Sequence, residues 1–233
     1  MSLQVRSTAS EEMDAPGLDP AIYARCLDDL ASVNRTTFAH KATLNWLRRS
    51  MAHLPPGSVV SVLDIAYGQG DLLRAIARMA DEAGLEAELT GIDLNPRSAA
   101  VARAVPSPET TVTYLTGDVF LYAPSSRFDF IVTSQFTHHL TDEAVVQLMA
   151  WMEAHASKGW YIADLHRHWF PYYGFRWLAR LAGWHEIVRR DGTVSIARGF
   201  KSAEWQSLLA RAGVSAEVRW HMLFRHGISR DKG

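Results

Sequence analysis

The amino-acid sequence predicts an α/β fold built on a doubly wound, seven-stranded, mostly parallel sheet with a C-terminal antiparallel hairpin. Three observations support this prediction. From Val59 onward, short runs rich in β-branched residues alternate with amphipathic stretches, as in strand–helix–strand units with right-handed crossovers. A buried run through Asp64 leads into a glycine turn that opens a helix. Two extended segments near the C-terminus are separated by very few residues, and only antiparallel strands can be joined so closely.

Length and composition limit the chain to one sizeable core. Its 233 residues can form an α/β domain with a cap but not two full domains. The formal net charge of -1 argues against a nucleic-acid partner. No apolar run is long enough to span a membrane, the N-terminus is polar and acidic, and the single Cys26 cannot form an internal disulfide. We therefore expect a cytoplasmic protein.

The region before the sheet divides into a lead and a helical cap. Residues 1–18 are polar and acidic, so we expect a flexible lead in which nothing packs. Asp19 followed by Pro20 is a strong helix start, because the acid caps the helix and proline suits its first position. The N-terminal cap over 19–58 is expected to hold helices at 20–34 and 37–53.

The main domain, expected over 59–230, carries the sheet and its helices. Thr141 before two acids is a good helix start, since the hydroxyl caps the helix and the acids favour its positive end. The expected strands are 59–66, 88–93, 111–115, 128–134 and 159–165, followed by the hairpin strands 215–221 and 223–230. The expected helices are 70–84, 96–104, 142–155 and 203–212.

The run Val-Leu-Asp-Ile-Ala-Tyr-Gly-Gln-Gly-Asp at residues 62–71 is the most informative segment. A glycine turn between strand and helix lets a ligand approach the backbone at the helix N-terminus. A dinucleotide-binding turn would need a further glycine where this chain has Leu73. Asp64 would repel phosphates, so the turn favours a small ligand that carries an ammonium and a sulfonium.

Two more acids follow the next two strands. Asp93 stands one strand–helix–strand unit after Asp64, where a carboxylate can accept both ribose hydroxyls of an adenosine. Asp118 follows the third strand. Ligands in open α/β sheets bind beyond the carboxyl ends of the strands, so the three acids should converge on one site.

These motifs resemble those of class I S-adenosylmethionine-dependent methyltransferases, and the terminal hairpin resembles the end of that family's seven-stranded sheet. The resemblance implies a Rossmann-like methyltransferase fold with S-adenosylmethionine as cofactor, and a contact from Asp118 to the adenine amino group. Within that family, the chain is similar to small-molecule O-methyltransferases of quinone and secondary-metabolite pathways. The cofactor-binding residues expected are Asp64, Ala66, Tyr67, Gly68, Gly70, Asp93, Leu94, Asp118, Val119, Gln135 and Arg35.

The chain departs from the family pattern at two positions of the glycine turn. Ala66 stands where the family has glycine, and an alanine there is strained if its φ is positive. Tyr67 either stacks on the ligand or points away into the N-terminal helices. Asn34 and Arg35, near the end of the first helix, are candidates for the methionine carboxylate, with a solvated helix end as the alternative.

A histidine pair after the fourth strand is the candidate catalytic group. His138 and His139 lie in a segment similar to the strand-end His-His-Leu of many small-molecule members of the family. Histidine titrates near neutrality and can take the proton of a phenol or enol, which makes either residue a candidate general base. The alternative is that both only hydrogen-bond the loop.

A second polar cluster closes the fifth strand. If the extended backbone continues, Asp164, His166 and His168 share one face and could ligate a metal. We expect instead no metal, and a substrate-facing role for His166 and Arg167.

An aromatic-rich insertion over 165–200 follows as the substrate lid. Trp169 and Tyr173 are its candidate substrate contacts, and its rings favour a flat, apolar acceptor, although packing on the lid's own core is the competing role. Residues 189–202 are expected to form a flexible flap.

The sequence thus predicts methyl transfer from S-adenosylmethionine to a small aromatic or polyketide-like hydroxyl. Carbon methylation of an activated ring is one alternative, and a catalytically silent cofactor-binding partner protein is another. The Asn/Asp-Pro-Pro-aromatic loop of DNA N-methyltransferases is absent, because Ser134-Gln135-Phe136-Thr137 occupies that place. The expected partner is a small-molecule substrate, and a homodimer stays open as the alternative to a monomer.

Overall fold

A seven-stranded sheet organises the computed structural model, which describes residues 3–106 and 111–232. The strand order is β3-β2-β1-β4-β5-β7-β6, and only the pairings of β7 are antiparallel. This confirms the predicted fold class, hairpin included. The strands are β1 (Val59–Ile65), β2 (Glu86–Asp93), β3 (Val112–Thr116), β4 (Phe128–Ser134), β5 (Ala156–Leu165), β6 (Glu217–His221) and β7 (Arg225–Asp231).

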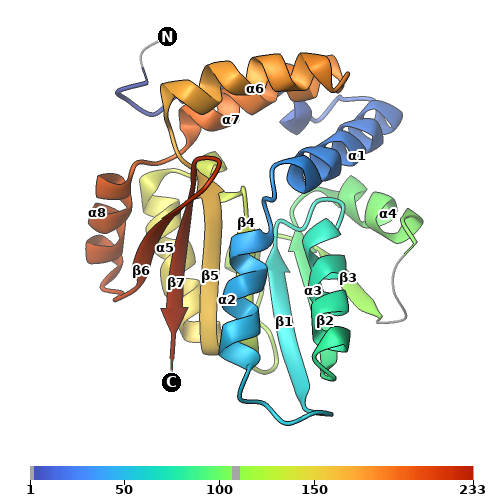
Figure 1. Ribbon diagram of the computed structural model, residues 1–233, viewed down its shortest axis with the longest axis vertical. Helices are drawn as coiled ribbons and strands as arrows, with labels where there is room; N and C mark the ends of the chain where they lie inside the picture. Colours follow the sequence, from blue (N-terminus) through green and yellow to red (C-terminus); the bar gives the residue numbers. More distant parts are fainter. Residues whose placement is uncertain (1–2, 107–110, 233) are drawn as a thin grey trace.

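Helices cover both faces of the sheet and its upper edge (Figure 1). The α-helices are α1 (Pro20–Thr36), α2 (Lys41–Met51), α3 (Asp71–Glu82), α4 (Pro96–Ala104), α5 (Asp142–His155), α6 (Trp169–Leu181), α7 (Glu186–Arg198) and α8 (Ser202–Ala212). Three short 3-10 turns are η1 (Glu12–Asp14), η2 (Val119–Leu121) and η3 (Thr137–His139). In the described part of the chain, no helix has the length and apolar character needed to cross a membrane.

Two hydrophobic cores lie on opposite faces of the sheet. One core joins α2 and α3 to the sheet through side chains such as Leu47 and Ile76. The other joins α5 and α8 through side chains such as Leu148 and Trp205. The central strands are buried on both faces, and this explains why β1 reads as an almost continuous apolar run.

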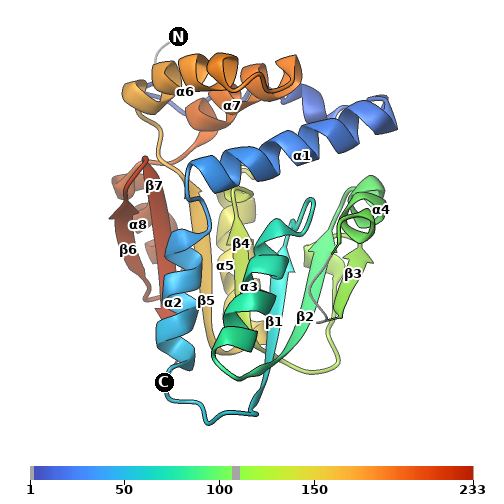
Figure 2. The ribbon, with the colours of Figure 1, turned by 45° about the vertical axis from the view of Figure 1, so that its right-hand side comes forward.

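Three helices, α1, α6 and α7, lie across the carboxyl ends of the parallel strands (Figures 1 and 2). They share a small core of their own that includes Cys26, Ala179 and Trp184. Of the two helices expected in an N-terminal cap, only α1 lies over this edge, because α2 packs against the sheet beside α3. The space under α1, α6 and α7 is where ligands of open α/β sheets bind.

The expectation that nothing packs in the N-terminal lead is wrong. Arg6 forms an ion pair with Asp142 at 2.6 Å, and the Asp191 carboxylate accepts the backbone N–H groups of Glu12 and Met13, both at 2.9 Å. These partners stand far along the chain from the lead, so its local polar composition could not reveal them.

The expected flap over 189–202 is also wrong, since most of it forms α7. The Asp-Gly pair that suggests a turn lies inside this helix. A Cβ on Gly192 would stand only 2.1 Å from a ring carbon of Phe175. Glycine is therefore needed here for close packing of α7 on α6, and not for a turn.

Candidate functional site

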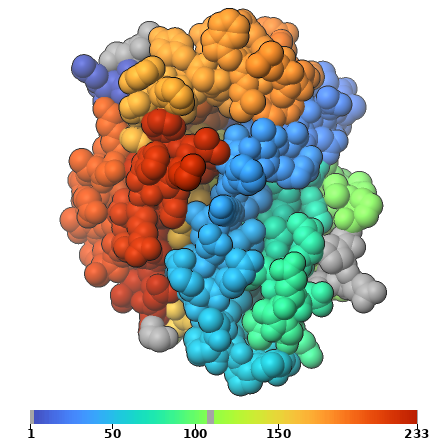
Figure 3. All heavy atoms as spheres, in the orientation of Figure 1, coloured from blue at the N-terminus to red at the C-terminus, as the bar shows by residue number. Residues whose placement is uncertain are grey.

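A cavity of about 420 Å³ lies between the carboxyl ends of β1 and β4 and the helices above them. In the space-filling view, α1, α6 and the tip of the β6–β7 hairpin meet over it (Figure 3). Its size is within the range of roughly 300 to 1,000 Å³ found for small-molecule sites. The glycine turn after β1 lines one end and the histidine segment after β4 lines the other, so the two predicted motifs share one cavity.

The glycine turn is held in a left-handed conformation. Ala66, Gly68 and Gly70 have φ values of 60°, 54° and 77°. The alanine is therefore in the strained state that the sequence allowed for, and its N–H donates to Ile92 O at 2.8 Å. Gln135, after β4, is strained in the same way with φ 55° and also lines the cavity. Strained residues of this kind concentrate at ligand sites.

Three carboxylates gather around this turn. Asp93 accepts the N–H groups of Gly68 at 2.9 Å and Asn95 at 2.8 Å and so holds the turn. Asp64 is only 2% exposed, and burial together with the Asp71 and Asp93 carboxylates raises its pKa well above the ordinary value. A ligand with a positive charge would offset this crowding of negative groups.

Asp71, the first residue of α3, is a cavity residue that the sequence analysis did not select. Its carboxylate accepts from His40 at 2.8 Å and Asn34 at 2.9 Å. Burial opposes ionisation of Asp71, but these hydrogen bonds and the His40 charge lower its pKa to about 2. Asn34 in turn accepts from the side-chain amide of Gln135 at 2.6 Å, so one network joins α1, α3 and the loop after β4. The position of Asp71 directly after the glycine turn is the signal that could have identified it as a site residue.

Arg225, at the start of β7, is a second cavity residue that the sequence did not suggest. Its side chain is 7% exposed and donates to Thr37 Oγ1 at 2.8 Å and Thr37 O at 3.3 Å. Within residues 3–106 and 111–232 its Nε has no hydrogen-bond partner. Burial lowers the Arg225 pKa to about 10, which still leaves it charged at neutral pH. Such a buried cation favours a ligand carboxylate. Arg35, the predicted candidate, is exposed and lies away from this cavity.

The predicted adenosine contacts lie at the neighbouring strand ends, outside the lining of this cavity. Leu94 is 73% exposed after β2, whereas Val119 is buried in the core beside β4. Asp118 accepts the N–H of Phe120 at 2.9 Å. Tyr67 contributes to the lining of the cavity, and its ring packs on Tyr114 and over Gly91.

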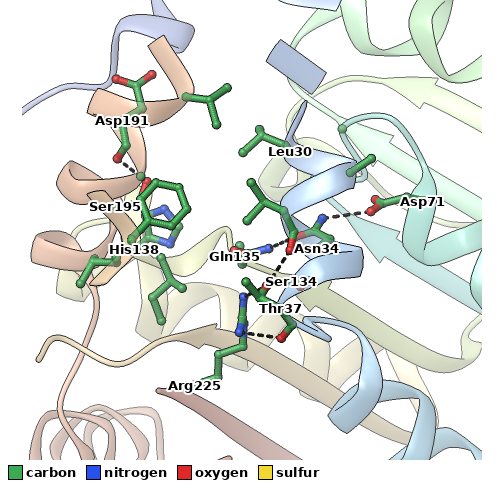
Figure 4. Close-up of a pocket in the computed structure, with 18 of the residues that line it drawn as sticks. Leu30, Asn34, Thr37, Asp71, Ser134, Gln135, His138, Asp191, Ser195 and Arg225 are labelled. Atoms are coloured by element: carbon green, nitrogen blue, oxygen red, sulfur yellow. Dashed lines mark hydrogen bonds between the residues drawn. The ribbon is translucent and has the colours of Figure 1, made fainter. Parts of the chain in front are cut away.

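His138 is buried and paired with Asp164 of β5. Its Nδ1 lies 2.7 Å from Asp164 Oδ1, and the other carboxylate oxygen accepts from Thr137 Oγ1 and from the His138 N–H. Burial alone would lower the His138 pKa, but the Asp164 charge outweighs it and raises the pKa to about 9. Burial likewise opposes ionisation of Asp164, yet His138 holds that pKa at about 2. The pair therefore places a protonated imidazole at the cavity wall (Figure 4).

The other ring nitrogen of His138 faces the N-terminal lead. Its Nε2 lies 3.6 Å from Glu11 Oε1, and His139 Nε2 lies 3.8 Å from the same oxygen. His139 also contacts Asp14 through Nδ1 at 3.1 Å. The lead thus contributes a carboxylate directly to the candidate catalytic pair, and the acidic run in its second half is the signal that could have shown this.

The cluster expected after β5 separates in the structure. Asp164 faces His138, whereas His166 packs against His226 and accepts from Trp220 Nε1 at 3.2 Å. His168 caps the N-terminus of α6. His166 and His168 stay together, with ring centroids 5.7 Å apart, but the Asp164 carboxylate points to His138 and does not join them.

The remaining substrate candidates also lie away from the cavity. Arg167 is buried and bonds Gly199 O and the Glu204 carboxylate, so it ties the lid to α8. Trp169 and Tyr173 are 61% and 53% exposed on the outer face of α6. Helical periodicity turns other α6 residues inward to the cavity instead: Phe170, Pro171, Gly174, Phe175 and Leu178.

Comparison with known proteins identifies the domain. A family model described as a methyltransferase domain matches residues 62–159, which include the glycine turn and the histidine pair. The curated proteins contain no match.

The fold has many solved relatives at low sequence identity. One is the magnesium protoporphyrin IX methyltransferase ChlM of Synechocystis PCC 6803 with bound S-adenosylhomocysteine, with TM-score 0.56, 15% identity and coverage of 95% of this chain and 91% of that one. Another is the plantazolicin methyltransferase BpumL, also with S-adenosylhomocysteine, with TM-score 0.64, 14% identity and 89% of each chain covered. Human N-acetylserotonin methyltransferase with S-adenosylmethionine aligns with TM-score 0.62 and 15% identity over 92% of this chain and 57% of that chain. Residues 62–159 of the chain therefore match a methyltransferase domain, and the chain shares the fold of methyltransferases solved with S-adenosylhomocysteine or S-adenosylmethionine.

Proposed function

We propose that this protein transfers the methyl group of S-adenosylmethionine to the hydroxyl oxygen of a small aromatic or polyketide-like acceptor. The observation that carries the proposal is the Asp164–His138 pair at the wall of the cavity that also contains the glycine turn. A carboxylate-held imidazole at this place suits an acceptor whose oxygen must lose a proton. The ring-lined inner face of α6 suits a flat, apolar acceptor.

The cavity fits the amino-acid part of the cofactor. Asp64 and Asp71 would receive its ammonium, because both line the cavity beside the glycine turn, where burial and the Asp71 and Asp93 charges raise the pKa of Asp64. Arg225 would receive its carboxylate through the guanidinium nitrogen that has no partner among the described residues. Asp93 would hold the ribose and Asp118 the adenine, as the resemblance implies. When bound, the cofactor supplies an already activated methyl group.

The chain's own residues would then align the acceptor and accept the proton of its hydroxyl group. His138 would lie against the acceptor oxygen. After the Nε2 proton of His138 has left to solvent, Nε2 would take the acceptor's proton, and the Asp164 carboxylate would stabilise the imidazolium that results. The helices α1, α6 and α7 would exclude water from the cleft. Arg225 and Asn34 would fix the orientation of the cofactor relative to the histidines.

The experiment combines calorimetry with methyl turnover on a library of phenols. We expect S-adenosylhomocysteine to bind, and His138→Gln to lower turnover by about a hundredfold to ten-thousandfold without changing that affinity, the usual size of an acid–base effect. In this variant Asp164 keeps three hydrogen-bond donors, namely Thr137 Oγ1 and the backbone N–H groups of residue 138 and Leu165, so the site stays folded. The matched control is His155→Gln, since His155 stacks on Trp151 at the far end of α5. Turnover within about threefold of the parent would remove His138 from the chemistry.

A further inference from the structure

The carboxylate of Glu11 occupies a pocket of hydrogen-bond donors at the histidine end of the cavity. Ser195 Oγ donates to Glu11 Oε1 at 2.9 Å. His138 Nε2, His139 Nε2 and Arg198 Nη1 lie 3.6, 3.8 and 3.9 Å from the same oxygen. The donors come from η3 and α7, and Figure 4 shows His138 and Ser195 lying together at this end of the cavity.

The groups that surround this oxygen favour an anion. Arg198 is fixed in place because it donates to His138 O at 3.0 Å and to Ala9 O at 3.1 Å. Burial would raise the Glu11 pKa, but the nearby His138 and His139 outweigh it and lower that pKa, so the carboxyl is ionised. The side chain of Glu11 is 9% exposed, so the charge–charge attraction is only weakly screened by water.

The hold on the carboxylate is nevertheless loose. Distances of 3.6 to 3.9 Å are longer than an N–H···O hydrogen bond, so Ser195 supplies the one contact of hydrogen-bond length among these four. The backbone of the lead is anchored elsewhere, through the N–H groups of Glu12 and Met13 on Asp191. The Glu11 side chain can therefore leave the pocket while the lead stays bound.

We propose that the Glu11 carboxylate occupies the subsite of the acceptor's reacting oxygen, and that an acceptor with an ionised oxygen, of the phenolate or enolate class, displaces it. This inference rests on the proposed function and names its acceptor more narrowly. The subsite and the glycine turn line the same cavity, and the bound cofactor would present its methyl group inside that cavity. Two anions cannot share these donors, because their mutual repulsion in a buried site is large. Glu11 thus balances the positive charge of this pocket when no acceptor is bound.

Two other roles for Glu11 make different predictions. A general base would stay in place and accept the acceptor's proton. A metal ligand is also conceivable, because Glu11, His138 and His139 offer ligand atoms within 4.8 Å of one another. Arg198, 3.9 Å from Glu11 Oε1, disfavours a cation at that position.

The test measures binding of 4-nitrophenolate to the full chain, by absorbance, with and without S-adenosylhomocysteine. Glu11→Gln removes the competing charge and keeps the shape of the side chain. The matched control is Glu12→Gln, which removes a neighbouring charge that pairs with Arg190 on the surface. We expect Glu11→Gln to bind 4-nitrophenolate about tenfold tighter or more, with a lower KM for phenolic acceptors, and Glu12→Gln to behave as the parent. Affinity for neutral 4-nitroanisole should stay the same in all three proteins.

Unchanged or weaker phenolate binding in Glu11→Gln overturns the inference. A fall in kcat of about a hundredfold with no gain in affinity would assign Glu11 as a base instead. Binding of Mn²⁺ or Zn²⁺ by the parent that Glu11→Gln abolishes would assign it as a metal ligand. Glu11→Ala serves as a second variant if the amide impairs folding. Absence of S-adenosylhomocysteine binding would contradict the proposed function, whereas the phenolate measurement without cofactor tests the subsite independently.

Discussion

The charge state of His138 determines how the site can handle a proton. With a pKa of about 9, His138 carries a proton at neutral pH. The groups that face it are Asp164 on β5, Glu11 on the lead, His139 beside it and Arg198 on α7. An acceptor hydroxyl can be ionised here only if one proton leaves the complex. Activity should therefore rise with pH up to about the His138 pKa of 9.

At the residue scale, we predict that Asp164→Asn moves this rising limb to lower pH. The amide supplies no negative charge, so burial becomes the dominant influence and the His138 pKa falls toward or below its ordinary value. The measurement is the pH profile of kcat/KM for a phenolic acceptor, whose apparent pKa values belong to the coupled groups.

The control for this profile is Asp129→Asn. Asp129 bonds Ser61 and Lys158 on the strands next to β4 and does not line the cavity, so its loss should leave the limb in place. If the limb stays at the same pH in Asp164→Asn, then the titrating group is not His138.

The lid depends on one close contact between two helices. Phe175 of α6 stacks on Trp184 and lies against Gly192 of α7, where a Cβ would be 2.1 Å from the ring. The same face of α6 lines the cavity, so the spacing between α6 and α7 affects the width of the cavity at its histidine end.

At the element scale, we predict that Gly192→Ala destabilises the protein by about 1–3 kcal/mol, the cost of overpacking a tight contact. The matched control is Gly174→Ala in α6, where a Cβ would meet nothing within 4 Å. That change should stabilise the protein by about 0.5–1 kcal/mol, because alanine favours helix over glycine. Urea unfolding with an unchanged m-value gives both differences. Equal effects of the two substitutions would show that the Phe175 contact does not control lid packing.

The whole molecule combines a deeply buried sheet with a more weakly buried lid. The strands β1, β4 and β5 are covered on both faces, whereas Ala179 is the one buried residue among the thirteen of α6. Several large apolar side chains of α6 face solvent, among them Trp177 at 68% and Leu181 at 85% exposed. Regions with few buried contacts open at lower free energy than the core.

At the whole-molecule scale, we predict that amide hydrogens of α6 exchange at least about tenfold faster than those of β1 and β4. Saturating S-adenosylhomocysteine should add protection at residues 64–71 and raise the free energy of unfolding, by about 2.7 kcal/mol when present at 100 times its Kd. Hydrogen exchange read by mass spectrometry tests both statements, with the edge strand β6 as the region that should not respond. Protection of α6 equal to that of β4 would contradict the division into core and lid.

The sequence by itself determined the features that depend on local pattern. Alternating β-rich and amphipathic runs predicted the doubly wound sheet, since side-chain period and helix caps act over a few residues. The short link before β7 predicted the hairpin, and the glycine turn after β1 predicted the cofactor end. Bounds differed by only a few residues, as for β2, expected at 88–93 and observed as Glu86–Asp93.

Only the tertiary structure decided which distant side chains meet. Glu11 reaches His138, Arg225 enters the cavity from the last strand, and Asp164 pairs with His138 and not with His166. The predictions for the lead and for α7 were wrong for the same reason. An acidic segment is typical of a mobile lead, but Asp191 binds its backbone. An Asp-Gly pair is typical of a turn, but Phe175 packs on Gly192 inside a helix. These contacts join residues far apart along the chain, and no local periodicity records them. Their energies come from burial, charge and close packing, and the assembled fold creates all three.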